Sequence, residues 1–303
     1  MNNCLDFNIK SRYQGYKVQV YMREVLEFSS RFCRKTAKEG RIEINFRKAT
    51  LFSKLSEGDK LRIYLPEEDE NVIEPDELEL NILYEDDLII AVEKKPGIVV
   101  HPTKKHIRET LLNGVAYYLA DKGIKTMPRL ISRLDRDTTG VIVIAKNSFG
   151  HMRLAKEMEK KTYKKEYFAI VHGMIQKKSD IIDKPIHSID GEIKRFIDKA
   201  GKRSITKYDL ISCNEIGSLI KLELITGRTH QIRVHMSSIG HSLYGDSLYG
   251  EEATKLLDRQ ALHAYSVEFP HPIEKKVIRI TCPLPEDMNV LIKKLSLKKG
   301  SFQ

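Results

Sequence analysis

Hydrophobic and polar positions over the first 65 residues follow two different periods. Apolar residues recur at helical spacing between residues 18 and 39, and Gly40 stands where a helix would end, so this segment predicts a helical pair. Residues 41–46 alternate as a strand does, and residues 55–63 contain a turn that leads into another strand. The pattern predicts a small unit of helices and strands.

From about residue 80 onwards, the pattern indicates many short strands. Residues 80–84 and 88–92 flank a polar turn and predict an antiparallel hairpin. Further strands are expected around residues 167–171, 205–211 and 219–224. Together these segments predict a large sheet.

Two helices interrupt these strands. Residues 108–122 carry apolar residues on one side and end at Gly123, and Asn147 or Ser148 can cap a second helix that reaches about residue 160. Because strands and helices do not alternate regularly, we expect an α+β fold with a mixed, mostly antiparallel sheet and a central cleft.

The segment between the two patterns is strongly acidic. Residues 66–79 hold eight acids, two prolines and no base, and like charges with prolines favour an extended, exposed linker. We therefore expect a small domain over residues 1–65, an acidic linker over 66–79 and a main domain over 80–303.

The composition is basic, with 52 Lys and Arg against 42 Asp and Glu and a net charge of +10. Such a surface attracts polyphosphates and makes binding dependent on salt, but it does not name an activity. Within the small domain the cations either contact RNA or form a solvated face; they include Arg31, Arg34, Lys35, Lys38 and Arg41.

The cysteines bear on the cellular compartment. Cys4, Cys33, Cys213 and Cys282 are scattered, which is typical of reduced thiols and predicts neither a disulfide nor a zinc site. The chain has no signal-like start and no run of about 18 apolar residues, so we expect a cytoplasmic protein that does not enter a membrane.

Residues 133–140 place acids among cations just before the apolar run 141–145. A carboxylate between Arg133 and Arg136 is held in its charged form, which suits a nucleophile or a base. The alternative is a polar turn before a core strand.

A second polar segment supports the first interpretation. Residues 222–235 form an alternating strand that breaks at Thr-Gly and continues into cations and amides, which fits an anionic ligand. A metal site at His230 and His235 is disfavoured, because their spacing is no known ligand pair and no further ligands follow. Residues 240–250, rich in Gly and Tyr, are typical of a loop that approaches a ligand closely.

Over nearly its whole length the chain resembles the RluA-type RNA pseudouridine synthases. The motifs occur in the family's order, at residues 84–87 with 96–102, 133–140, 165–173, 226–235, and 261–264 with 269–272. Two departures are visible: Ser132 replaces a usual His, and residues 94–97 replace the usual Lys-Pro-x-Gly. The small domain resembles the RNA-binding module of ribosomal protein S-four, although a stabilising cap is the alternative.

The resemblance implies isomerisation of uridine to pseudouridine in RNA. Substrate and product are isomers, so no cofactor and no metal are expected, and the chain shows no nucleotide-binding loop. Asp135 matches the catalytic aspartate, acting as nucleophile or as the base that removes the ribose 2′ proton. Asp137 is the rival acid, which spacing alone does not separate from Asp135.

The resemblance also implies roles for other residues. Arg233 matches the cation that pairs with the catalytic aspartate, and phosphate binding is its alternative role. Tyr167 matches the tyrosine that packs against the flipped base and helps remove the carbon-5 proton; otherwise it belongs to the core. The residues expected to hold RNA phosphates are Arg133, Arg136, Arg228, His230 and Gln231.

The expected substrate is large-subunit ribosomal RNA, with transfer RNA as the alternative, and we expect a monomer. Two other classes stay open at this point. One is a ribosome-associated RNA-binding protein without activity, and the other is a hydrolase that uses His230 and Asp135 on phosphodiesters.

Overall fold

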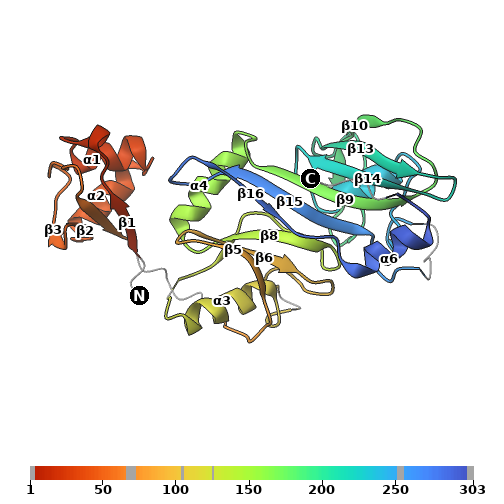
Figure 1. The fold of residues 1–303 in the computed structure, drawn as a ribbon, viewed down its shortest axis with the longest axis horizontal. Coiled ribbons are helices and arrows are strands. Elements are labelled where there is room, and N and C mark those ends of the chain that lie inside the picture. Colours follow the sequence, from red (N-terminus) through yellow and green to blue (C-terminus); the bar gives the residue numbers. More distant parts are fainter. Residues whose placement is uncertain (1–3, 66–72, 104–105, 125, 251–255, 299–303) are drawn as a thin grey trace. The chain divides into compact units, whose positions relative to one another are not determined.

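In the computed structural model, the described residues are 4–65, 73–103, 106–124, 126–250 and 256–298 (Figure 1). Half of the predicted acidic linker, residues 66–72, lies outside them. None of the described helices is long and apolar enough to cross a membrane.

Residues 4–65 form a four-stranded antiparallel sheet with short helices. The strand order is β1-β4-β2-β3, from β1 (Cys4–Asn8), β4 (Lys60–Tyr64), β2 (Ile42–Ile44) and β3 (Arg47–Lys48). The helical segments are η1 (Ser11–Tyr13), α1 (Val18–Val20), η2 (Tyr21–Val25) and α2 (Ser30–Lys38). The predicted helical pair and both predicted strands are present, whereas β1 was not predicted.

Ser29 separates the two helical segments of this small unit. Its side chain accepts a hydrogen bond from the backbone N–H of Phe32 at 3.1 Å and so caps α2. The core between helices and sheet consists of buried apolar side chains, among them Val18, Met22, Ile42 and Leu61.

The described residues after 65 are organised by a sheet of ten strands. Its order is β10-β13-β14-β9-β15-β8-β6-β5, with β16 beside β15 and β7 beside β8. Among the described strands only β8 and β15 pair in parallel, so the predicted mixed, mostly antiparallel α+β fold is confirmed. The strands are β5 (Asn81–Glu85), β6 (Ile89–Lys94), β7 (Arg129–Leu130), β8 (Thr139–Ala145), β9 (Lys164–His172), β10 (Ser179–Asp183), β13 (Ile205–Cys213), β14 (Gly217–Leu224), β15 (Leu262–Pro270) and β16 (Val277–Thr281).

Four described helices and a separate hairpin accompany this sheet. The hairpin pairs β11 (Ile186–Ser188) with β12 (Arg195–Ile197). The helices are α3 (Leu111–Asp121), α4 (Ser148–Glu159), α5 (Gln231–Ser237) and α6 (Glu286–Lys294). The predicted helices correspond to α3 and α4, and Asn147 caps α4 through Gly150 N–H at 2.8 Å. Neither α5 nor α6 was predicted.

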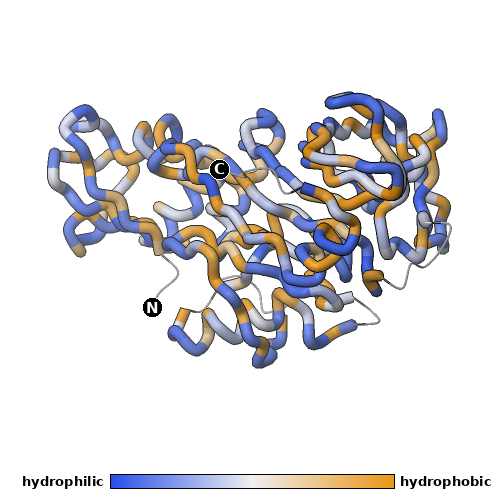
Figure 2. The backbone as a smooth tube through the Cα atoms, turned by 45° about the vertical axis from the view of Figure 1, so that its right-hand side comes forward, coloured by the Kyte–Doolittle hydropathy of each residue, from blue (hydrophilic) through white to orange (hydrophobic). Residues whose placement is uncertain are grey.

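Strand β8 lies inside the sheet and positions the loop that precedes it. All seven of its residues are buried, and most are β-branched. Gly140 has a φ of 115°, and a Cβ there would lie 2.2 Å from the carbonyl oxygen of Ala264, so only glycine allows β8 and β15 to approach this closely. Figure 2 shows hydrophobic and hydrophilic positions alternating along the backbone.

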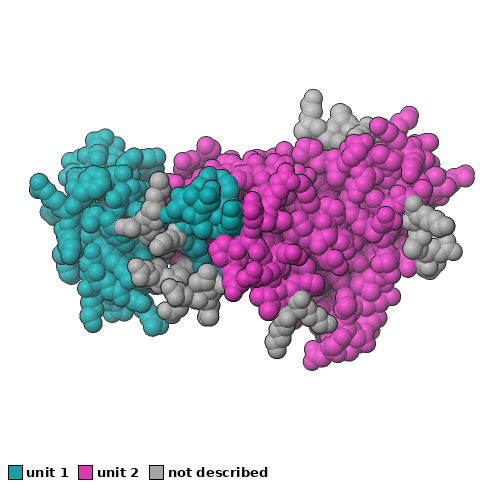
Figure 3. Space-filling model, turned by 90° about the horizontal axis from the view of Figure 1, so that it is seen from below, with its two compact units in different colours: residues 1–73, 116–127 teal, residues 74–115, 128–303 magenta. Residues whose placement is uncertain are grey.

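The chain divides into two compact units, residues 1–73 with 116–127 and residues 74–115 with 128–303 (Figure 3). The second unit contains all the predicted catalytic residues. The predicted domain boundaries at residues 65 and 80 stay a prediction.

Candidate active site

The loop before β8 is held by its own backbone and by two buried basic side chains, Lys94 and Arg259. The carbonyl of Asp135 accepts a hydrogen bond from Thr138 N–H at 3.1 Å. The carbonyls of the next two residues accept hydrogen bonds from Lys94 Nζ at 2.5 Å and from Arg259 Nη1 at 3.3 Å. Three successive carbonyls are therefore fixed, and the backbone that carries the Asp135 carboxylate has little freedom.

Lys94 is fully buried at the end of β6. Burial lowers the pKa of Lys94 to about 7, against the opposing effect of the Asp137 carboxylate. Its amine also donates to the carbonyl of Lys95 at 2.9 Å. A neutral amine has two N–H groups, and the carbonyls of Lys95 and Arg136 accept one hydrogen bond from each.

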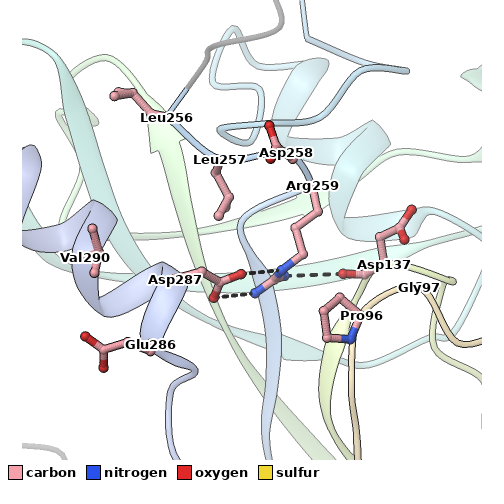
Figure 4. A pocket seen from close by; sticks show the side chains of 10 residues that line it. All are labelled: Pro96, Gly97, Asp137, Leu256, Leu257, Asp258, Arg259, Glu286, Asp287 and Val290. Carbon is pink, nitrogen blue, oxygen red and sulfur yellow. Dashed lines mark hydrogen bonds and ion pairs between the residues drawn. The ribbon is translucent and has the colours of Figure 1, made fainter.

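Arg259 connects the loop to α6. It makes a two-pronged ion pair with Asp287, at 2.7 and 2.9 Å, in the first turn of that helix. Both residues line a pocket of about 630 Å³. Figure 4 shows them in this pocket together with Asp137, Pro96 and Gly97, which also line it. The residues that line this pocket do not include Asp135, so the two acids of the loop lie in different surroundings.

Helix α5 brings Arg233 to Asp135. The turn before this helix places His230 in the left-handed region at a φ of 58°, and the helix then buries Arg233, which is 7% exposed. Arg233 Nη1 lies 3.3 Å from Asp135 Oδ2. The predicted pair is thus close in space, although 98 positions separate its members.

The shorter contacts of Arg233 go to another carboxylate, Asp246. Arg233 donates to it through Nε at 2.7 Å and through Nη2 at 2.8 Å. Burial alone would lower the pKa of Arg233, but Asp246 and then Asp135 raise it. Asp246 also accepts the backbone N–H groups of Leu248 and Tyr249, at 3.0 and 3.1 Å. It fixes the guanidinium so that Nη1 points toward Asp135.

Sequence reasoning missed Asp246. The only available signal was its position in the loop 240–250, which was predicted to approach a ligand because of its Gly and Tyr content. An aspartate in such a loop is usually a turn residue, and nothing local indicates that it pairs with an arginine on a neighbouring helix.

His230 lies beside the same carboxylate. Its Nε2 is 3.9 Å from Asp135 Oδ2, and its Nδ1 is 2.9 Å from the hydroxyl of Tyr249. Burial lowers the pKa of His230, and the charge of Asp135 offsets this only in part. The neutral imidazole is therefore favoured at neutral pH.

Tyr167 lies on β9 and is 5% exposed. Burial raises the pKa of Tyr167, and the negative charge of Asp135 raises it further. The two side chains are thus close enough to interact electrostatically, and the phenol stays protonated at neutral pH.

The residues predicted to hold phosphates fall into two groups. Arg133, Arg136 and Arg228 are exposed. The prediction that Gln231 holds a phosphate does not agree with its surroundings, because it is 2% exposed and both ends of its amide are bonded inside the protein. Its oxygen accepts from Thr226 at 2.8 Å, and its nitrogen donates to the Ile205 carbonyl at 3.0 Å.

Within the part of the chain that the structure describes, no three His, Cys, Asp or Glu side chains gather in a way that could hold a metal ion. His230 and His235 have separate partners. His235 is fully buried and contacts Thr206 Oγ1 at 2.9 Å and the Lys184 carbonyl at 3.0 Å.

The sequence and the fold are similar to known proteins. The family described as RNA pseudouridylate synthase matches residues 88–238. YhcT of Bacillus subtilis (strain 168), named an uncharacterized RNA pseudouridine synthase, is 36% identical over 290 residues, which are 95% of this chain and 96% of that protein. A ribosomal large subunit pseudouridine synthase D of Vibrio cholerae is 34% identical over 299 residues, 92% of this chain and 91% of the relative.

Among solved structures, Human RNA Pseudouridylate Synthase Domain Containing 4 superposes with a TM-score of 0.60 at 22% identity. It covers 72% of this chain and 94% of its own. At this identity the likeness concerns the fold alone.

Proposed function

Because the chain belongs to the RNA pseudouridylate synthase family and is an RNA pseudouridine synthase, we propose that it isomerises specific uridines of large-subunit ribosomal RNA. Support for this target comes from relatives named ribosomal large subunit pseudouridine synthase D, which are 31% and 34% identical over 96% and 92% of this chain. We also propose that the protein is a monomer and that it acts in the cytoplasm.

The observation that carries the assignment of the active site is the chain of charges Asp135, Arg233 and Asp246. Since Asp246 holds Arg233 with two short hydrogen bonds, the remaining Nη1 is directed at Asp135 Oδ2 and orients this partly buried carboxylate. We assign to Asp135 the attack on the ribose, or removal of the 2′ proton, that breaks the bond to uracil nitrogen-1.

The new bond then joins carbon-5 of the uracil to the same ribose carbon, and carbon-5 must lose its proton. A buried, protonated phenol is a poor base, so we assign Tyr167 to contact with the uracil ring rather than to proton removal. We assign removal of this proton to the Asp135 carboxylate, which lies close to Tyr167. Nitrogen-1 gains a proton as carbon-5 loses one, so no atoms are gained or lost overall.

A paired uridine is inaccessible inside a helix, so the target must be flipped out of the RNA into the site. The exposed Arg133, Arg136 and Arg228 surround the loop and the turn before α5, and we assign them to phosphates of the flipped strand. These contacts position the RNA without reading its sequence.

The test is to map pseudouridine in ribosomal and transfer RNA from cells with and without this protein, and then to add the purified enzyme to unmodified transcripts in EDTA. We expect specific uridines of large-subunit RNA to be converted in intact chains. Loss of pseudouridine from transfer RNA alone would contradict the target, and chain cleavage would contradict the activity.

Asp135→Asn provides the matched variant, because it keeps the size of the side chain but loses its charge. We expect no detectable conversion and nearly unchanged affinity for RNA. The control is Asp137→Asn, which alters the acid that lines the pocket beside Arg259 and should keep most of the activity. Substantial turnover by Asp135→Asn would rule out Asp135 as the catalytic acid.

A further inference from the structure

Lys165 on β9 is a largely buried lysine whose amine reaches solvent only at its tip. It is 7% exposed, and its amine has no ion pair and no hydrogen bond among the described residues. Burial lowers the pKa of Lys165, and no carboxylate lies close enough to oppose this effect. Burying most of a lysine without a partner carries a desolvation cost, which a negatively charged ligand at the tip of the side chain would offset.

The other charged residues at this end of β9 are all paired. Lys164 contacts Glu268 at 3.0 Å, and Glu166 contacts Arg279 at 2.8 Å and Lys221 at 3.4 Å. Side chains alternate between the two faces of a strand, so Lys165 shares the face of Tyr167, while its neighbours point the other way. A partner for the Lys165 amine must therefore lie on the face of the sheet that carries Tyr167.

The amine lies against the turn that leads into α5. A Cβ on Gly227 would lie 3.3 Å from Lys165 Nζ, and Gly227 does not have a positive φ. The glycine thus serves to leave room for the amine rather than to permit an unusual backbone. Because Gly227 is exposed, the amine lies at the edge of the site, where β9 meets this turn.

Two positions along a strand span about 7 Å, so Lys165 can reach the nucleotide next to the one that Tyr167 contacts. The negatively charged groups of RNA are its phosphates, and a lysine ammonium binds a phosphate as a compact point charge. We propose that Lys165 binds a backbone phosphate of the RNA strand next to the flipped uridine. This inference rests on the proposed role of Tyr167 and on RNA as the substrate.

Three variants test the proposal on the full-length enzyme. Lys165→Met keeps the length of the side chain and removes the charge, Lys165→Arg keeps the charge, and Lys164→Met is the control on the opposite face. The probe is an unmodified large-subunit ribosomal RNA transcript. Its dissociation constant is measured from low to moderate salt, and turnover is measured at saturating RNA.

We expect Lys165→Met to weaken binding by about tenfold or more and to reduce the slope of log Kd against log salt by about one. Lys165→Arg should recover most of the affinity, and Lys164→Met should behave as the parent does. Lys165→Met should also melt at the same temperature as the parent or higher, because it removes an unpaired buried charge. A lower melting temperature with unchanged binding would overturn the proposal in favour of a structural role.

Two further outcomes would also overturn it. One is an unchanged salt slope in Lys165→Met, and the other is a fall in turnover at saturating RNA without a change in affinity, which would place the amine in the chemistry. If the parent binds this RNA but converts no uridine in it, the proposed target is wrong, whereas the comparison of salt slopes still decides the role of Lys165.

Discussion

Among single residues, Arg233 determines most of the site's electrostatics, because it divides one guanidinium between two carboxylates. Its two-pronged pair with Asp246 is shorter than its contact with Asp135, which is also the more exposed of the two acids. The geometry therefore separates a holding partner, Asp246, from the acid that is left free to meet the substrate.

The first prediction follows from this division. Arg233→Lys keeps the positive charge but cannot donate to Asp246 through two parallel groups and to Asp135 at once. We expect turnover at saturating RNA to fall by at least about tenfold, while the dissociation constant for RNA changes by less than about threefold. The measurements are single-turnover kinetics and equilibrium binding.

Arg228→Lys is the matched control, since Arg228 is exposed and is assigned to a phosphate. Its turnover at saturating RNA should equal that of the parent. If Arg233→Lys instead loses affinity and keeps its turnover, Arg233 is a phosphate contact, and its assignment to Asp135 is wrong.

Between elements, the end of β6 holds the loop before β8 through the buried amine of Lys94. The pKa of Lys94 is about 7 in the folded protein, against an ordinary value of 10.5. Between these pH values the unfolded chain binds more protons than the folded one, so the contribution of Lys94 to stability rises with pH. Below pH 7 both states are protonated, and the cost of burying the charge is constant.

We therefore expect the free energy of unfolding of the parent to rise relative to that of Lys94→Met between pH 7 and 9, by up to about 1.4 kcal/mol per pH unit. Urea unfolding of the parent and of Lys94→Met at three pH values measures this difference in the free energy of unfolding. Lys94→Met should also lose at least about tenfold in turnover, because the loop loses an anchor.

Lys95→Met is the control for this prediction. The Lys95 side chain is exposed and pairs with Glu79 at 3.2 Å, so its removal should leave the pH dependence as in the parent. Parallel curves for the parent and Lys94→Met would show that Lys94 does not titrate in this window.

For the whole molecule, the basic net charge predicts salt-dependent binding, and α2 carries cations that point to solvent. We propose that this helix contributes to RNA binding. Replacing its four exposed cations by Gln in the full-length enzyme should lower the salt slope of binding by about three to four if each contacts a phosphate. The cations are Arg31, Arg34, Lys35 and Lys38.

The control replaces Lys177 and Lys207, which are paired with Asp180 at 2.7 Å and with Glu223 at 3.6 Å. It should change the slope little, since these charges are already partly compensated. An unchanged slope in the α2 variant would favour the alternative that the small unit only stabilises the enzyme.

The sequence by itself determined the features that depend only on residues close together along the chain. The hairpin of β5 and β6, the cap at Asn147 and the buried strand β8 follow from local patterns of apolar and polar positions. The family resemblance singled out Asp135, Tyr167 and Arg233, because the order of motifs can be read without knowing the distances between them.

Only the tertiary structure decided which groups meet. The pair of Asp246 with Arg233 and the hydrogen bond of Lys94 to the loop before β8 each join segments that are distant in the chain. The isolation of Lys165 depends on the absence of a partner in space among the described residues. The burial of Gln231 is likewise set by the tertiary structure. The physical reason is that hydrogen bonds and desolvation depend on distances in space, whereas a sequence pattern reports only the spacing along one strand or helix.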